Sequence, residues 1–487
     1  MTTRSYAGLW VVLGLSCTGC ASELDGSPVG MRAAQLTAAG VELIATGVLD
    51  ASGADKSAKT AAALENGAPG NLLGGIGSGL AHVRGDTYLA VPDRGPNATK
   101  YDAELDDTTS YIPRFHTLTL ALHESAPGAA LPYALEPELR ATTLLWSRTP
   151  LVYGAGDALV GDGTPALNDA HRFYFSGRSD NFDPAQPSTD PHDGRFDPEN
   201  IRVSNDGRHV FIADEYGPYI YQFNRRSGLR ERVFTLPADF AVTQLRAAGD
   251  TEIKDNKQGR VANKGMEGLA IAPDGTTLIG AMQSPLAQDG GTAAPYVRIV
   301  TVSIASGAIA QYAYPLTNIG TDEKPKYPTV SEITAINAHA LLVDERDGKG
   351  LGDDSEAKYK RIYRVDLCEG SDVSGLQGAD ALAEHALEKT LFADLVELLT
   401  AHGLAASEIP AKLEGLTFGP DVTLDGARKL SLFVSNDNDF LPEIQDETHP
   451  DAVANPNQFF VFAVDPEALP GFEPQAVAGR EDGHGLD

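Results

Sequence analysis

The sequence predicts an all-β fold built from repeated hairpins, and three observations support this prediction. First, a glutamate followed by a short alternating apolar run recurs along the chain, as in Glu267–Asp274 and again in Glu414–Asp421. Second, a turn and a second apolar strand follow each run, which is typical of a β-hairpin. Third, glycine (50 residues) and proline (30 residues) are abundant, as many turns require. Repeated carboxylates at strand starts are expected to gather around one axis.

In chain order, the hairpins form a series of related units. Their first strands begin at five positions: Ser78 in a degenerate copy, then Glu199, Glu267, Glu332 and Glu414. The long gap after the first copy leaves room for one more unit around residues 114–146. Each unit also carries an outer strand pair, clearest in residues 296–314, so we expect about six four-stranded units with a period of roughly 65 residues. This series is typical of a β-propeller; unrelated hairpins in a β-sandwich are the alternative.

The outer ends of the two strands in a hairpin lie side by side, so polar residues at those ends become neighbours. The expected neighbours are Glu199 with Glu215, Glu332 with Glu345, and Glu414 with Asp437. Residues 41–46 are predicted to pair beside residues 458–464 and close the ring. Closure removes the exposed strand edges that an open sheet would carry.

Two segments break the repeat. Residues 379–403 carry leucines at helical spacing and end at Gly403, which predicts one inserted helix before the last glutamate strand. Its leucine stripe is expected to pack against the blades rather than bind a ligand. The polar insertion at residues 179–198 is rich in aspartate but does not fit the EF-hand pattern, so we expect a solvated loop there.

The N-terminal residues 1–20 are predicted to be an export signal. An apolar run at residues 7–15 follows Arg4 and is too short to span a membrane. Small residues precede Cys20, as in a bacterial lipoprotein signal, so Cys20 is the expected acylated residue; simple cleavage after Ala21 is the alternative. The remaining organisation would be a tether (21–40), the propeller (41–470) and a flexible tail (471–487). We therefore expect an exported protein, lipid-anchored in the bacterial cell envelope.

The chain is strongly acidic, with 68 Asp and Glu against 38 Lys and Arg and a formal charge of −30. This charge argues against nucleic acid as a partner, and against contact with an anionic membrane except through a lipid anchor. Carboxylates that converge on one mouth would need bound cations or raised pKa values to offset their repulsion. Hard oxygen ligands favour Ca²⁺, with Mg²⁺ as the alternative. The sequence contains no serine-triad elbow, His-Glu-x-x-His, P-loop or paired-cysteine zinc motif, so hydrolysis would rest on metal ions and carboxylates.

Six ordered motifs carry a family resemblance. They are Asp214–Pro218, Lys264–Ala270, Gln283–Leu286, Asp344–Arg346, Leu413–Leu416 and Ser435–Phe440. They resemble the bacterial phytase-like domain family, also called esterase-like activity of phytase, over about residues 41–465. The chain departs from the pattern at Asn200, where glycine is favoured, and at Ser78, where later units have glutamate. The resemblance implies hydrolysis of phosphoesters or esters by an exported protein, by analogy with calcium-dependent propeller phytases.

The first expected function is a metal-dependent phosphoric ester hydrolase, acting as a monomer on a small-molecule phosphoester or ester. Its expected catalytic residues are Glu215, Glu267, Glu332 and Glu414. Its expected metal ligands are Glu199, Asp214, Glu215, Glu267, Glu332, Glu345, Glu414 and Asp437. Arg94, Lys264 and Arg346 are expected to neutralise substrate phosphate, arginine through its bidentate fork.

The second expected function is a non-catalytic, lipid-anchored binding module. In that case the repeated glutamates would accept backbone N–H groups from neighbouring blades and hold the ring together. A lactonase-like sugar hydrolase built on a propeller is the third alternative. The first two classes differ in a structural property: structural glutamates would be buried and saturated by N–H donors, whereas metal ligands would face a solvent-filled cup.

Overall fold

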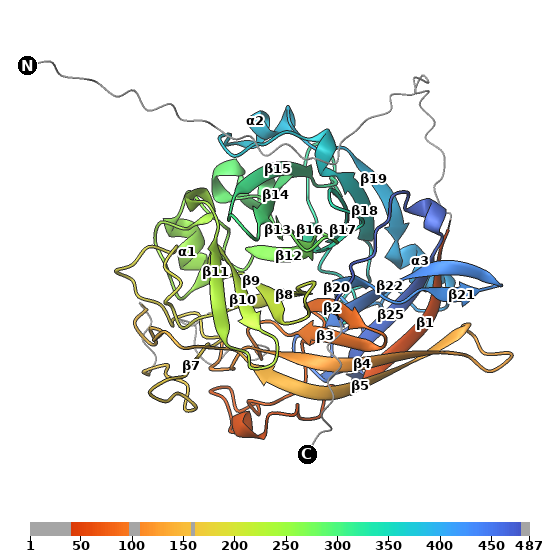
Figure 1. Ribbon diagram of the computed structural model, residues 1–487, viewed down its shortest axis with the longest axis horizontal. Coiled ribbons are helices and arrows are strands. Elements are labelled where there is room, and N and C mark those ends of the chain that lie inside the picture. The colour runs from red at the N-terminus through yellow and green to blue at the C-terminus, as the bar shows by residue number, and fades with distance from the viewer. Residues whose placement is uncertain (1–39, 97–107, 157–160, 479–487) are drawn as a thin grey trace, which may run out of the picture. The chain divides into compact units, whose positions relative to one another are not determined.

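The structure is a computed structural model that describes residues 40–96, 108–156 and 161–478, and these residues form a β-propeller (Figure 1). The predicted export signal, Cys20 and residues 21–39 lie outside the described residues. Within the described residues, the main strands form five four-stranded blades. The sequence-based expectation of about six blades is therefore corrected to five.

Each blade is listed from its innermost to its outermost strand. The first contains β2 (Gly79–Arg84), β3 (Thr87–Val91), β4 (Arg114–Glu124) and β5 (Tyr133–Leu144). The second contains β8 (Pro198–Val203), β9 (His209–Asp214), β10 (Tyr219–Asn224) and β11 (Arg230–Thr235). The third contains β12 (Met266–Ile271), β13 (Thr277–Met282), β14 (Tyr296–Ser303) and β15 (Ile309–Pro315). The fourth contains β16 (Thr329–Ala335), β17 (Ala340–Arg346), β18 (Lys360–Asp366) and β19 (Lys389–Asp394). The fifth contains β20 (Lys412–Phe418), β22 (Ala427–Asp437), β25 (Asn457–Val464) and β1 (Val41–Leu49).

Short elements complete the described fold. β6 (Trp146–Ser147) pairs with β7 (Phe173–Tyr174), β21 (Val422–Leu424) pairs with β22, and β23 (Glu443–Ile444) pairs with β24 (Val453–Ala454). The α-helices among the described residues are α1 (Gly249–Asp255), α2 (Ala379–Ala383) and α3 (Leu395–Ala401). None of the helices in the described residues is long and apolar enough to cross a membrane.

The sixth unit was expected at residues 114–146, but these residues form β4 and β5, the outer strands of the first blade. These strands are long, at 11 and 12 residues. Loops and the small β6–β7 pair then occupy the described residues before β8. Long outer strands and an insertion therefore fill the gap that the spacing assigned to a further hairpin.

Closure of the ring by the two ends of the propeller is confirmed. β1 pairs antiparallel with β25, from Val41 opposite Val464 to Leu49 opposite Asn457, and Figure 1 shows these red and blue strands side by side. The inner strands contact one another in the cyclic order β2, β8, β12, β16, β20 and back to β2. The last blade thus combines strands from both ends of the described chain.

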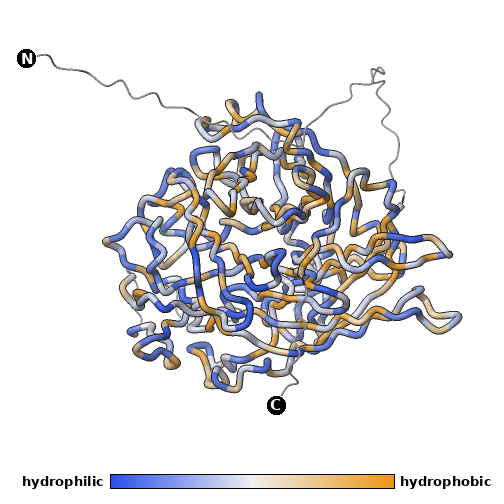
Figure 2. The backbone as a smooth tube through the Cα atoms, in the orientation of Figure 1, coloured by the Kyte–Doolittle hydropathy of each residue, from blue (hydrophilic) through white to orange (hydrophobic). Residues whose placement is uncertain are grey.

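The core lies between adjacent blades. Hydrophobic stretches follow the blade strands, whereas hydrophilic residues are more frequent in the connections (Figure 2). Leu269, Ile279 and Ile333 are examples, fully buried in one cluster formed by neighbouring blades. Burial at roughly 25 cal/mol per Å² of apolar surface favours this packing.

Two boundaries predicted from the sequence differ in the structure. Residues 379–403 form not one helix but α2 and α3, separated by β19, because the outermost strand of the fourth blade interrupts the leucine pattern. Leu382, Leu395 and Leu399 of this segment are nevertheless buried in the core, so their packing role is confirmed. In addition, residues 471–478, assigned to the flexible tail, bond to the blades through Glu473 N to Ile336 O and Ala478 N to Asn205 O.

Candidate functional site

Each inner strand of the last four blades has a β-bulge near its start. In β8, Pro198 pairs with Asp214 and Asn200 with Ala213, so Glu199 is the extra residue. The same register makes Glu267 the extra residue in β12 and Glu414 in β20. Bulges bend a strand and re-aim a side chain. The recurring glutamates of these three blades therefore have one shared structural position.

The fourth blade differs from this pattern by one residue. Val330 pairs with Glu345 and Glu332 with Asp344, so the extra residue is Ser331. Glu332 therefore takes the position held by Asn200 and by glycine in other blades, and its expected pairing with Glu345 is replaced by one with Asp344. The sequence carries a signal for this difference: glycine and then leucine follow Glu267 and Glu414, whereas Ile333 directly follows Glu332.

A second set of equivalent positions lies at the ends of the second strands. In the last four blades, each is two residues beyond the partner of the residue that follows the bulge; in the first blade, it is two residues beyond Val91, the partner of Gly79. These positions hold Asp93, Glu215, Gln283, Arg346 and Asp437. The five blades thus deliver mainly acidic side chains to the end of the propeller at which the inner strands begin.

Seven carboxylates and four cations form what we call the mouth cluster. The carboxylates are Asp93, Asp197, Glu199, Glu215, Glu267, Glu414 and Asp437, all buried. The cations are Arg94, Lys264, Arg346 and Lys412. Seven negative groups against four positive ones leave a formal excess of three negative charges. An excess of this kind in a buried site requires proton uptake or bound cations.

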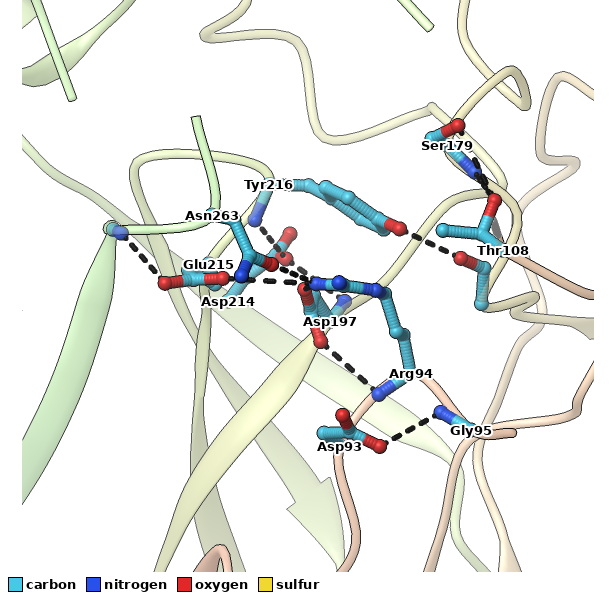
Figure 3. Close-up of polar contacts among 12 residues, drawn as sticks. Asp93, Arg94, Gly95, Thr108, Ser179, Asp197, Asp214, Glu215, Tyr216 and Asn263 are labelled. Atoms are coloured by element: carbon cyan, nitrogen blue, oxygen red, sulfur yellow. Dashed lines mark hydrogen bonds and ion pairs between the residues drawn. The ribbon is translucent and has the colours of Figure 1, made fainter. Parts of the chain in front are cut away.

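One side of the mouth cluster is organised around Asp197 (Figure 3). Its Oδ2 lies 2.7 Å from Arg94 Nη1, and its Oδ1 accepts the backbone N–H of Arg94 at 3.0 Å. Arg94 Nη1 also donates to Asn263 Oδ1 and lies 3.9 Å from Glu215 Oε2. Oxygen atoms of Asp197, Glu199 and Glu215 lie within 4.8 Å of one another. Oxygens at Ca²⁺ coordination distances of 2.3–2.6 Å have separations of up to about 5 Å, so these three residues fit a calcium ion.

The other side of the mouth cluster holds ion pairs between neighbouring blades. Arg346 Nη2 pairs with Glu414 Oε1, and Lys412 Nζ lies 2.8 Å from Asp437 Oδ2. Glu267 lies between the two sides. It is 3% exposed, and its Oε2 has no hydrogen-bond partner among the described residues. A buried carboxylate oxygen without a donor is unfavourable, so this atom is available to a ligand or a proton.

Burial dominates the electrostatics of the cluster. Loss of solvent raises the pKa of Glu199 and Glu267 well above the usual value, and neighbouring carboxylates raise each pKa further. For Glu215, burial and Asp197 raise the pKa, while Arg94 and the backbone N–H of Gly265 oppose the rise. These groups therefore hold protons more tightly than exposed carboxyls do.

Three expected ligands are not among the carboxylates of the mouth cluster. Asp214 Oδ1 accepts the backbone N–H groups of Asp197 at 3.2 Å and Tyr216 at 3.0 Å. Glu345 accepts hydrogen bonds from Tyr314 of the third blade at 2.7 Å and from Tyr359, which precedes β18 of its own blade, at 2.8 Å. It also pairs with Lys389 Nζ. Both carboxylates thus have donors of their own.

Glu332, the third of these residues, lies on the propeller axis. Its Oε1 accepts bonds from the backbone N–H of Ile333 at 2.7 Å and of Leu269 at 3.2 Å, and its Oε2 lies 3.0 Å from Arg202 Nη2. Arg202 in turn donates to the carbonyl oxygens of Leu80, Ile201, Ile333 and Leu416, on the inner strands of four blades. Glu332 Oε1 therefore has the backbone N–H donors expected of a structural glutamate, and its Oε2 is paired with Arg202.

Some cluster residues were missed at the sequence level. Asp93 lies in the motif that contains Arg94, and Lys412 lies two residues before Glu414. The repeat pattern could therefore have identified both residues. Asp197 belongs to the insertion expected to be a solvated loop; its position two residues before Glu199 was the available signal.

A cavity of about 250 Å³, lined in part by Arg202, Thr334, Phe418 and Phe472, opens at the other ends of the inner strands.

Comparison with known proteins places the chain in a family. The family model described as Phytase-like, esterase-like activity of phytase, matches residues 71–440. The chain belongs to this family. An uncharacterized secreted protein of Arthroderma benhamiae is 29% identical over 347 residues, which cover 62% of this chain and 64% of the relative. The chain thus spans less than two thirds of the length of that relative.

Two solved structures are weakly similar to the chain. The periplasmic gluconolactonase PpgL of Pseudomonas aeruginosa is 12% identical with a TM-score of 0.29, covering 80% of this chain and 89% of that one. The Malassezia sympodialis allergen Mala s 1 is 13% identical with a TM-score of 0.32, covering 79% of this chain and 77% of that one. At these values, neither likeness bears on the chemistry of this family member.

Proposed function

We propose that the chain is an exported, calcium-dependent hydrolase of phosphoric esters or related esters, with the mouth cluster as its reaction centre. The observation that carries the proposal is the buried excess of carboxylates, including three whose oxygens lie within 4.8 Å of one another. The family description, esterase-like activity of phytase, supports ester hydrolysis as the reaction class. Fold alone would not support it.

The donor set suits a hard cation. Asp197, Glu199 and Glu215 would hold Ca²⁺, with Mg²⁺ as the alternative, and Glu267, Glu414 and Asp437 lie in the same network. The bound ion would supply Lewis-acid polarisation of a phosphoryl or acyl oxygen. Asp214, Glu332 and Glu345 are not included among the proposed ligands, because none of them belongs to the group whose oxygens lie within 4.8 Å of one another.

The chain's own side chains have separable tasks in this proposal. Lys264, whose Nζ lies 2.9 Å from Gln283 Oε1, and Arg346 orient the anionic group of the substrate by charge. Glu267 Oε2, which has no hydrogen-bond partner among the described residues, holds or accepts a proton during hydrolysis; burial and neighbouring carboxylates raise its pKa, which favours proton uptake. Glu215 and Glu414 keep their proposed catalytic roles within the same cluster.

Export and anchoring belong to the same proposal. The Arthroderma benhamiae relative is described as secreted, which supports export of this chain. The small residues before Cys20 support acylation of that cysteine and attachment to the bacterial cell envelope. The reaction centre would then act on small molecules outside the cytoplasm, as a monomer.

The test is an assay on phytate, nucleotides, aryl phosphates and aryl esters, with and without a chelator. We expect hydrolysis of at least one class, lost on chelation and restored by calcium. Glu267→Gln should lower the rate at least tenfold, the lower range of general acid–base contributions. The exposed Glu388→Gln is the matched control and should not. Hydrolysis that chelation leaves unchanged would overturn the metal-dependent proposal.

A binding module without catalysis is the second candidate. It is favoured by Glu332, one of the repeated glutamates, whose donors are those of a structural residue. This candidate gains support if calcium binds the purified protein while none of the substrate classes is hydrolysed.

A further inference from the structure

Arg94 donates hydrogen bonds to both carboxylate oxygens of Asp197. Its backbone N–H donates to Oδ1 at 3.0 Å, and its Nη1 lies 2.7 Å from Oδ2. The same Nη1 donates to Asn263 Oδ1 and lies 3.9 Å from Glu215 Oε2 (Figure 3). The guanidinium therefore lies among the carboxylates whose oxygens have the spacing of a cation site.

The backbone of Arg94 is held more firmly than its side chain. A Cβ at Gly177 would lie 1.8 Å from the Arg94 carbonyl oxygen, so a neighbouring loop packs directly against this peptide. By contrast, the Arg94 side chain is 11% exposed and its Nε has no hydrogen-bond partner among the described residues. The side chain can therefore leave Asp197 by breaking only the bonds of Nη1, while the backbone bond to Oδ1 remains.

A second buried group indicates that the cluster accepts a ligand. Glu267 is more than nine-tenths buried, interacts with the charges of Glu215 and Glu414, and has an Oε2 without a donor. Arg94 satisfies Asp197 but does not reach this atom within hydrogen-bond distance. Arg94 thus neutralises only the Asp197 side of the mouth cluster.

We propose that Arg94 and a divalent cation compete for Asp197, so that cation binding releases the Arg94 side chain toward the mouth, where it pairs with an anionic group of the substrate. This inference rests on the proposed function, because it assumes that the cluster binds a cation. Two positive charges cannot share Asp197 Oδ2 at contact distance without strong repulsion. Loading of the cation would then precede capture of the anion.

The competition makes a prediction that simpler roles do not make. If Arg94 only bound substrate, its removal would leave calcium affinity unchanged. If it acted only through its positive charge, Arg94→Gln would raise calcium affinity, but Asn263→Gly, which keeps that charge in place, would not. Competition for Asp197 instead requires that removal of Arg94 raise the affinity more than removal of Arg346, which pairs with Glu414 on the other side.

The experiment is calorimetric titration of chelator-stripped protein with calcium alone. Arg94→Gln should bind calcium on the order of tenfold more tightly than the unsubstituted protein, within the usual range of couplings between sites. Arg346→Gln should show a clearly smaller gain in calcium affinity. Asn263→Gly should also bind calcium more tightly, because the Arg94 guanidinium loses an acceptor that holds it beside Asp197. Asn263 has a φ of 54°, a conformation that glycine adopts without strain.

Each outcome separates the competition from the proposed function. Unchanged or weaker binding by Arg94→Gln, or an equal gain by Arg346→Gln, overturns the competition and leaves calcium binding in place. If calcium binds none of the proteins, both the proposed function and the competition are overturned. Melting curves without calcium check folding; if Arg94→Gln does not fold, the comparison of Asn263→Gly with Arg346→Gln decides.

Discussion

Arg202 of the second blade and Glu332 of the fourth meet across the propeller axis, with Nη2 and Oε2 3.0 Å apart. Their side chains are 5% and 0% exposed. The repeated glutamates therefore divide into two groups. Glu332 ties the inner strands together from the axis, whereas Glu199, Glu267 and Glu414, at the bulged positions, face the mouth cluster.

Substitution of Arg202 should destabilise the whole ring. Arg202→Met removes the partner of a buried carboxylate and leaves carbonyl oxygens of four blades without this donor. We expect the free energy of unfolding to fall by about 3–5 kcal/mol, the usual cost of removing one partner from a buried ion pair. Urea denaturation measures the change.

The matched control for this prediction is Arg208→Met. Arg208 pairs with Asp206 at the surface, where both side chains are exposed. Its substitution should change the free energy of unfolding by at most about 0.5 kcal/mol. A change of that small size for Arg202→Met as well would contradict the role assigned to the axial pair.

The stability of the calcium-free protein should fall as pH rises from about 4 to about 8. Burial raises the pKa of Asp214 to about 8 and that of Asp344 to about 8, from a usual value of 3.8. A carboxyl with a raised pKa binds its proton more tightly in the folded chain. Its stabilising contribution is complete below the unfolded pKa and is lost as pH rises through the folded one. Melting temperatures in chelator should therefore be higher at pH 5 than at pH 8.

Asp344→Asn tests the cause of this pH dependence. Both oxygens of Asp344 are buried and have no hydrogen-bond partner among the described residues, so the amide replaces a titrating group without the loss of an acceptor that was in use. The variant should melt higher than the unsubstituted protein at pH 8 and change little at pH 5. A variant that is less stable at pH 8 would show that the ionised carboxylate is needed.

The repeating parts of the fold were predictable from the sequence. Alternating apolar strands and turn residues predicted the hairpins, and the two terminal strands predicted closure by residues 41–46 and 458–464, as β1 and β25 show. The blade number was wrong because residues 114–146 have the same alternation whether they are inner or outer strands. Spacing alone does not distinguish a new blade from long outer strands followed by an insertion.

The candidate site was predictable to the level of the repeat and no further. Carboxylates at strand starts predicted a convergence of Glu199, Glu267 and Glu414 on one end. The bulge at Ser331 moves Glu332 out of this set. The local signal for this shift was that Ile333 directly follows Glu332, whereas glycine follows Glu267 and Glu414. Asp197 enters the site through loop packing against Arg94, which hydrophobic periodicity does not report.

Acylation of Cys20 is a prediction about residues outside the described structure. Lipoprotein processing should leave Cys20 as the modified N-terminal residue and should place the protein in the membrane fraction. Mass spectrometry of the N-terminal peptide, with Cys20→Ala as the control, measures both. An unmodified N-terminus downstream of Cys20, or a Cys20 linked by a disulfide to Cys368, would contradict the anchor.

Glu267→Gln and Glu332→Gln should have opposite effects, because their surroundings differ. Glu267 has an unpartnered Oε2 in the mouth cluster, whereas Glu332 accepts backbone N–H groups and pairs with Arg202. A cation that binds only the folded chain raises its melting temperature by mass action. Glu267→Gln should therefore reduce the shift caused by calcium and melt close to the unsubstituted protein in chelator.

Glu332→Gln should instead melt earlier in chelator and keep the calcium shift, because a buried ion pair is weakened and no mouth ligand is lost. Melting curves of both variants, each with calcium and with chelator, measure the four values needed. If neither variant nor the unsubstituted protein responds to calcium, while Glu267→Gln melts much earlier, then Glu267 is a structural residue. The assignment of the mouth cluster as a calcium-dependent reaction centre should in that case be abandoned.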